Sequence, residues 1–188
     1  MEYSTLDKLG VRVSRLGFGC MRFPLTAEGK IDEPRAAAML DTAYKAGVTY
    51  YDTAYFYHQH TGEAFLGRAM KRYPRDTFYL ATKMPMSIVE SLDHAKEIFE
   101  GQLAALQTDY VDFYLLHGVN GERWKQAQEM GIVDFLLEMQ KAGRIRHFGF
   151  SFHGSYEEFE TILTARDWDF CQIQFNYMDQ EIQAGMRG

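Results

Sequence analysis

The sequence predicts an α/β fold built from successive strand–helix units, because short apolar runs alternate with longer segments of helical periodicity. The predicted strands begin near residues 16, 50, 79, 111, 147 and 170, about 23 to 36 residues apart, which is the spacing of one βα unit each. No linker, low-complexity tract or charge block divides the chain. We therefore predict one domain over residues 1–188.

The first half of the chain supplies a hairpin and two units. Residues 5–14 are expected to form a β-hairpin with Leu9-Gly10 at its turn, and residues 15–19 a short strand ended by glycine. Asp32 can cap a helix that Gly47 ends. A second strand over 49–51 and a short helix ending before Pro74 follow, and then a strand over 78–82.

The second half continues the alternation. A helical face runs from 95 to 106, and the near-continuous apolar run 110–116 is typical of a strand buried on both faces. One long helix is expected from about Trp124 to residue 142, before a strand over 147–151. Ser155 and Glu158 have the spacing of a capping box, and a sixth strand is expected over 170–175.

Two architectures fit this alternation, a doubly wound sheet and a (β/α)8 TIM barrel. The dinucleotide-binding form of the first normally carries GxGxxG after its first strand, whereas this chain has Gly17-Phe18-Gly19-Cys20-Met21-Arg22, without the third glycine. The barrel is therefore favoured. A closed barrel needs eight strands and about 250 residues, so we expect an incomplete barrel of about six βα units behind an N-terminal hairpin, truncated before strands seven and eight.

Composition excludes several functional classes. The formal charge of −6 disfavours nucleic acid, since phosphate binding needs clustered Lys and Arg. No apolar run reaches the roughly 18 residues that span a bilayer, and the N-terminus lacks the pattern of a signal peptide. Cys20 and Cys171 lie far apart without a CxxC pair. We expect reduced thiols, a cytoplasmic protein, no membrane partner and no metal site.

Polar side chains follow several predicted strands. Asp52 ends the second strand and Tyr57 lies in the loop after it, while Lys83 and His117 follow the third and fourth. Taken singly, each has an ordinary structural interpretation, such as a helix cap, a solvated charge or a packed ring. Together they indicate a site, because catalytic groups of parallel barrels gather at the carboxyl ends of the strands.

At these positions the chain resembles the aldo-keto reductases. Asp52-Thr53-Ala54-Tyr55-Phe56-Tyr57 is similar to the family's D-T-A-x-x-Y segment, and Gly62-Glu63 with Leu66-Gly67 to its G-E-x-x-L-G segment. Thr82-Lys83 resembles the third-strand lysine and Leu115-Leu116-His117 the fourth-strand histidine. The resemblance runs from about Leu6 to the end of the chain.

The resemblance implies hydride transfer from NADPH, or from NADH, to an aldehyde or ketone. Tyr57 would protonate the carbonyl oxygen; an ordinary phenol is a reluctant acid at neutral pH, so Lys83 would favour its phenolate form. Asp52 would pair with Lys83, and His117 would polarise and orient the carbonyl. The residues implied to contact cofactor are Gly19, Cys20, Met21, Asp52, Ser151 and Gln172, and those implied to line the substrate pocket are Tyr55, His58 and Trp124.

Some features leave alternatives open. Phe152 stands where many family members carry Asn, so one cofactor hydrogen bond is missing or replaced by packing. The segment 149–154 is similar to members with an appended iron–sulfur module, which would require cysteines outside this chain. A cofactor-sensing regulatory subunit with negligible turnover, like the potassium-channel β-subunits on this fold, is the main alternative to a reductase, and an inactive fragment is the third. The carbonyl substrate and the oligomeric state stay open.

Overall fold

The computed structural model describes residues 1–188 and contains a two-stranded hairpin and a six-stranded sheet. The strands of the larger sheet follow one another in chain order, and helices connect them. This order is that of βα units, so the predicted fold class, an incomplete (β/α)8 barrel, is confirmed. The six strands are β3 (Phe18–Gly19), β4 (Tyr50–Asp52), β5 (Tyr79–Met84), β6 (Val111–Val119), β7 (Ile145–Phe152) and β8 (Phe170–Ile173).

The chain divides into two compact units, which we describe separately. Unit 1 comprises Met1–Thr82 and Phe99–Asp112, and unit 2 comprises Lys83–Ile98 and Phe113–Gly188. Helix α3 (Leu92–Leu106) contributes residues to both units. No helix is both long enough and apolar enough to cross a bilayer.

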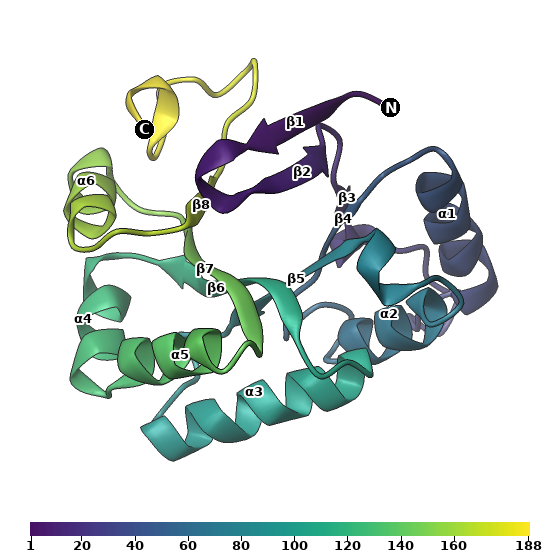
Figure 1. Ribbon diagram of the computed structural model, residues 1–188, viewed down its shortest axis with the longest axis horizontal. Helices are drawn as coiled ribbons and strands as arrows, with labels where there is room; N and C mark the ends of the chain where they lie inside the picture. Colours follow the sequence, from purple (N-terminus) through teal and green to yellow (C-terminus); the bar gives the residue numbers. More distant parts are fainter. The chain divides into compact units, whose positions relative to one another are not determined.

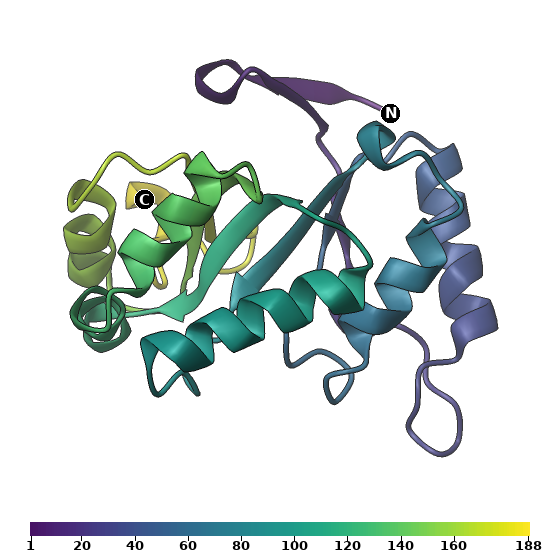
Figure 2. The ribbon, with the colours of Figure 1, turned by 60° about the horizontal axis from the view of Figure 1, so that its bottom comes forward.

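The predicted hairpin is present at the start of unit 1. Strands β1 (Tyr3–Leu6) and β2 (Val11–Ser14) pair antiparallel, and Figure 1 and Figure 2 show them as the purple ribbon beside the N-terminus. A 3-10 turn over Asp7–Leu9 joins them and ends at Gly10, whose φ of 65° lies in the left-handed region that glycine adopts without strain.

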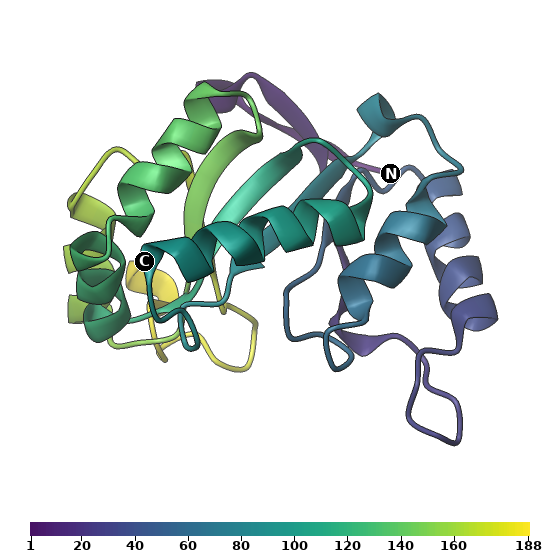
Figure 3. The same cartoon turned by 90° about the horizontal axis from the view of Figure 1, so that it is seen from below.

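Two helices lie side by side in unit 1, α1 (Glu33–Lys45) and α2 (Gly62–Met70) (Figure 3). The Asp32 side chain accepts a hydrogen bond from the Arg35 amide at the start of α1, as the sequence predicted. Within α2, a side chain at Gly67 would place its Cβ 2.5 Å from the Ala105 carbonyl oxygen. The backbones of α2 and α3 therefore approach each other as closely as glycine permits.

One arginine joins the starting ends of β5 and β6 in unit 1. The Arg75 guanidinium donates to the Asp112 carboxylate (2.6 Å) and lies over the Tyr110 ring, 4.2 Å from its centroid. The same carboxylate oxygen accepts from the Leu80 amide at 2.8 Å. The Asp112 side chain is 11% exposed, so this pairing is largely shielded from water.

Unit 2 contains two helices where the sequence predicted one. Helix α4 (Gly121–Glu129) ends before Gly131, and α5 (Ile132–Lys141) begins after it. Gly131 has a φ of 71°, a left-handed conformation that cannot continue a right-handed helix, so the prediction of a single helix from Trp124 to 142 is wrong. The periodicity on both sides of Gly131 had hidden the break.

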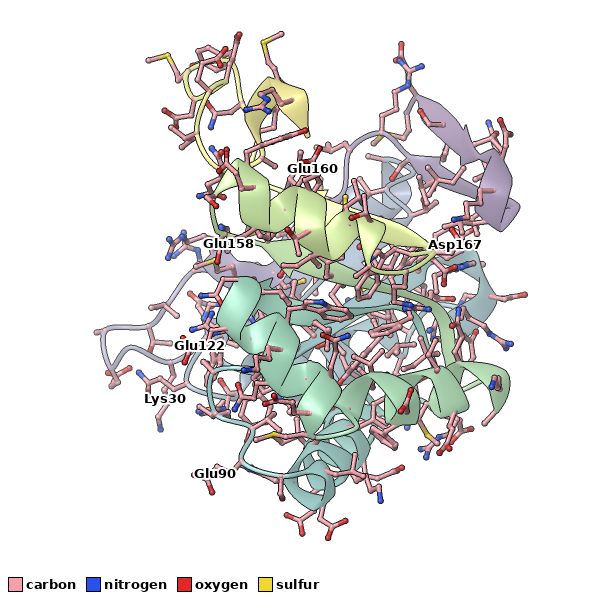
Figure 4. All side chains as sticks on the ribbon, turned by 90° about the vertical axis from the view of Figure 1, so that its left-hand side faces the viewer. Lys30, Glu90, Glu122, Glu158, Glu160 and Asp167 are labelled. Carbon is pink, nitrogen blue, oxygen red and sulfur yellow. The ribbon has the colours of Figure 1, made fainter.

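Helix α6 (Tyr156–Thr164) begins with the predicted capping box of Ser155 and Glu158. The Glu158 carboxylate accepts from the Ser155 amide (3.0 Å) and also from the Gly121 amide at the start of α4 (2.9 Å). Figure 4 labels Glu158 on α6 and Glu122 on α4, at the ends of the helices that this carboxylate joins. A single side chain thus caps α6 and ties it to α4.

Candidate active site

The four residues predicted to carry chemistry lie at or near the carboxyl ends of three successive strands. Asp52 is the last residue of β4, and Tyr57 lies in the loop that follows. Lys83 and His117 were expected to follow their strands. They lie inside them instead, one residue before the end of β5 and two before the end of β6, because strand pairing continues past the apolar runs that the sequence reveals.

Local hydrogen bonds shape the loop that carries Tyr57 in unit 1. The Tyr57 amide donates to the Ala54 carbonyl (3.1 Å), and the Gly62 amide donates to the Tyr57 carbonyl (3.2 Å). A Cβ on Gly62 would lie 3.0 Å from that same carbonyl oxygen, so a larger residue there would crowd the loop. Between them, His58, Gln59 and His60 all have positive φ, a conformation that costs energy in non-glycine residues.

His58 lies against the segment that follows β3. Its ring stacks on Phe23 at 5.4 Å between centroids, and its Nε2 atom is 3.0 Å from the Cys20 carbonyl oxygen. His58 also lines a unit 1 cavity of about 440 Å³ together with His60 and Arg68. The Tyr55 and His60 rings pack edge to face, with 4.7 Å between their centroids. The substrate contacts expected of Tyr55 and His58 stay predictions.

In unit 2, burial and charge keep His117 neutral. Desolvation, followed by the charges of Lys83, His153 and Arg123, lowers the pKa of His117 to about 4. Lys83 is only 2% exposed. At neutral pH the His117 imidazole therefore carries one N–H donor and no charge, which suits hydrogen bonding to a carbonyl oxygen better than proton donation.

Ser151 and Gln172, the two expected amide contacts, are neighbours in unit 2. Strands β7 and β8 pair parallel with Ser151 directly beside Gln172. Ser151 is buried, and its hydroxyl oxygen accepts a hydrogen bond from the Gly118 amide at 2.8 Å. That bond leaves the hydroxyl proton available to donate. A hydroxyl donor beside an amide side chain fits a carboxamide, which both donates and accepts.

The third expected cofactor segment, Gly19-Cys20-Met21, lies in unit 1. Gly19 and Met21 are exposed, and a Cβ on Gly19 would meet nothing within 4 Å, so the space beside Gly19 is open. Cys20 is fully buried instead, and its expected contact with a cofactor stays a prediction. Within unit 2, the Ser151 and Gln172 side chains have the chemistry that a nicotinamide carboxamide needs.

Trp124 is 7% exposed and packs against Trp168, with 5.4 Å between ring centroids. Trp168 in turn contacts Phe150 at 4.9 Å, and its indole N–H donates to the Ile162 carbonyl. This packing accounts for the burial of Trp124, and its place in a substrate pocket stays a prediction.

A buried polar cluster in unit 1, made of Glu63, Thr82 and Gln102, was not predicted from the sequence. The Thr82 hydroxyl donates to Glu63 Oε1 at 2.5 Å, and the Gln102 amide donates to the same oxygen at 2.8 Å. All three side chains are at most 5% exposed. The only available signal was Glu63 itself, an acidic residue in the apolar setting of α2.

Comparison with known proteins identifies relatives of the whole chain. The profile of the Aldo/keto reductase family matches residues 15–187. The aldo-keto reductase YhdN of Bacillus subtilis is 29% identical over 97% of this chain and 56% of its own length. The norsolorinic acid reductase stcV of Emericella nidulans is 32% identical over 76% of this chain and 40% of its own length.

Solved structures give the same result. The holo form of the aldo-keto reductase AKR11C1 from Bacillus halodurans superposes with a TM-score of 0.75 at 30% identity. That match covers 93% of this chain and 57% of the reductase. The chain spans about half the length of the curated relatives it matches.

Proposed function

This chain belongs to the aldo/keto reductase family, and on that premise we propose that it reduces an aldehyde or ketone to an alcohol with NADPH as the hydride donor. The family supports an oxidoreductase. The finer assignment rests chiefly on one observation: this chain carries a carboxylate, an ammonium, an imidazole and a phenol at or near the carboxyl ends of β4, β5 and β6.

The cofactor supplies the hydride that attacks the carbonyl carbon. As that bond forms, the carbonyl π electrons move onto the oxygen, where negative charge develops. Tyr57 donates its phenolic proton to this oxygen and is left as a phenolate, which solvent reprotonates. Lys83 stabilises the phenolate, and Asp52 fixes the lysine by charge pairing. The products are the alcohol and the oxidised dinucleotide.

His117 binds and orients the substrate in this proposal. Its lowered pKa supports a neutral ring at physiological pH, which presents an N–H to the carbonyl oxygen and withdraws electron density from the carbon. A charged imidazolium would compete with Tyr57 as the proton donor. In this proposal His117 therefore orients the carbonyl, and Tyr57 donates the proton.

Ser151 and Gln172 would hold the carboxamide of the nicotinamide, and the segment Gly19, Cys20 and Met21 would contact its ribose. The register of β7 and β8 supports this pairing. NADPH is proposed over NADH because it is the usual cofactor of the family. Two free cysteines are consistent with a reducing, cytoplasmic setting, which we propose as well.

Titration of the chain with NADPH and NADH, followed by dihydronicotinamide fluorescence, tests the cofactor site. We expect saturable binding, tighter for NADPH, and a Kd that rises about 3- to 10-fold in Gln172→Ala through loss of one hydrogen bond. Gln180→Ala, an exposed glutamine of the same unit, serves as the matched control and should leave the Kd unchanged. No saturable binding, or equal effects of the two substitutions, would contradict the assigned site.

A further inference from the structure

The Glu63 cluster is linked by hydrogen bonds to the backbone of Tyr57 and to the residue before Lys83. Glu63 is the second residue of α2. Its neighbour Gly62 donates through its amide to the Tyr57 carbonyl. Its own carboxylate holds the side chain of Thr82, the residue that precedes Lys83 in β5. The first turn of α2 therefore contacts the backbone of one residue and the immediate neighbour of the other.

The geometry points to Glu63 as a positioning residue, which holds the β5 backbone at Thr82, directly before Lys83. This inference rests on the proposed function. Successive side chains of a strand face opposite sides of the sheet, so Lys83 points away from the side on which Thr82 is held. Anchoring Thr82 on one face fixes the backbone from which Lys83 extends on the other.

The cluster is built for fixed geometry. Thr82 and Gln102 both donate to one oxygen of Glu63, and the Gln102 amide also lies 3.2 Å from the Thr82 hydroxyl oxygen, which closes a triangle. Thr82 is fully buried and Gln102 is 1% exposed, so water does not compete for these bonds. The three side chains come from α2, β5 and α3, so the triangle pins the strand between two helices.

The test compares side-chain length with side-chain charge. Glu63→Gln keeps the length and an acceptor oxygen but loses the charge, whereas Glu63→Asp keeps the charge and withdraws the carboxylate by one methylene. If position is what matters, Glu63→Asp lowers kcat about 100-fold with little change in KM or NADPH affinity, and Glu63→Gln retains most of the activity. An electrostatic role predicts the reverse order and would overturn the inference.

Asp112→Asn is the matched control, because Asp112 is also a buried carboxylate that holds β5, through the Leu80 amide at the opposite end of the strand. It should lower thermal stability while leaving kcat unchanged. A comparable loss of kcat in this control would mean that any weakening of β5 is enough, and would overturn the special role of Glu63.

A second readout does not depend on turnover. Amide hydrogen exchange should accelerate at Gly62 and Lys83 in Glu63→Asp and stay near the wild-type rate in Glu63→Gln and Asp112→Asn. If the unaltered chain reduces no carbonyl, the proposed function fails and the exchange result alone decides the positioning role. Unchanged exchange at both amides in Glu63→Asp overturns the inference in either case.

Discussion

Two glycines in neighbouring helices should respond to the same substitution with opposite signs. In Gly67→Ala, the new Cβ would lie 2.5 Å from the Ala105 carbonyl oxygen and 2.6 Å from the Leu106 carbonyl carbon. These are backbone atoms of α3, which cannot rotate away. In Gly101→Ala, within α3, the new Cβ would meet nothing within 4 Å.

The magnitudes follow from two opposing effects. Replacing glycine by alanine inside a helix stabilises it by about 0.5–1 kcal/mol, through lower backbone entropy of the unfolded chain. Gly101→Ala should show this gain unopposed. At Gly67 the overlap costs about 1–3 kcal/mol, as for other overpacked sites, so the net change should be a loss of about 1 kcal/mol, and at most about 2.5 kcal/mol.

Urea unfolding followed by circular dichroism measures both changes, read from the midpoint at constant slope. In thermal unfolding of a chain of this length, Tm should shift by about 2–4 °C per kcal/mol, downward for Gly67→Ala and upward for Gly101→Ala. Stabilisation by both substitutions would refute the close approach of α2 and α3, because helix propensity alone would then explain the data.

Three further predictions concern titratable side chains. The pKa of His117 in the folded chain is about 4, below the ordinary value of 6.5, so the unfolded chain binds more protons between these two pH values. The free energy of unfolding should therefore be unaffected above pH 6.5 and fall by up to about 3 kcal/mol as the pH drops to 4. His117→Asn should flatten that slope when unfolding is measured as a function of pH. Glu158→Ala removes the acceptor of the Ser155 and Gly121 amides and should cost about 1–2 kcal/mol, with Glu157→Ala, exposed on the same turn, as a near-neutral control; equal effects would contradict the cap. Asp112→Ala leaves the Arg75 guanidinium and the Leu80 amide without this acceptor and should cost about 3–5 kcal/mol by thermal denaturation, and a loss below 1 kcal/mol would show that water replaces the pair.

The order of the fold was predictable because its signals are local. The hairpin turn at Gly10, the Asp32 cap and the capping box at Ser155 depend on residues within a few positions of one another, and all three were predicted. The break at Gly131 was missed because apolar periodicity continues across it. Strand ends were placed too early at Lys83 and His117, since pairing depends on a partner strand that a single segment does not reveal.

The sequence predicted which residues form the candidate site, but not the packing and hydrogen bonds around them. The motif from Asp52 to Tyr57, Lys83 in β5 and His117 in β6 could be identified by resemblance to the family to which the chain belongs. The cluster around Glu63 could not, because Gln102 lies 39 residues away and neither Thr82 nor Gln102 has a distinctive sequence signal. Burial decided the state of His117, and burial is a property of the packed chain.

The most direct test of the central claim is carbonyl reduction by the purified chain, with NADPH and a panel of aldehydes and ketones. The alcohol and the oxidised cofactor should form in equal amounts. Tyr57→Phe, which removes only the hydroxyl, should lower kcat about 100- to 10,000-fold and leave NADPH binding intact. Turnover that survives Tyr57→Phe would contradict the role of this residue, and tight cofactor binding without reduction of any carbonyl would favour the cofactor-sensing alternative.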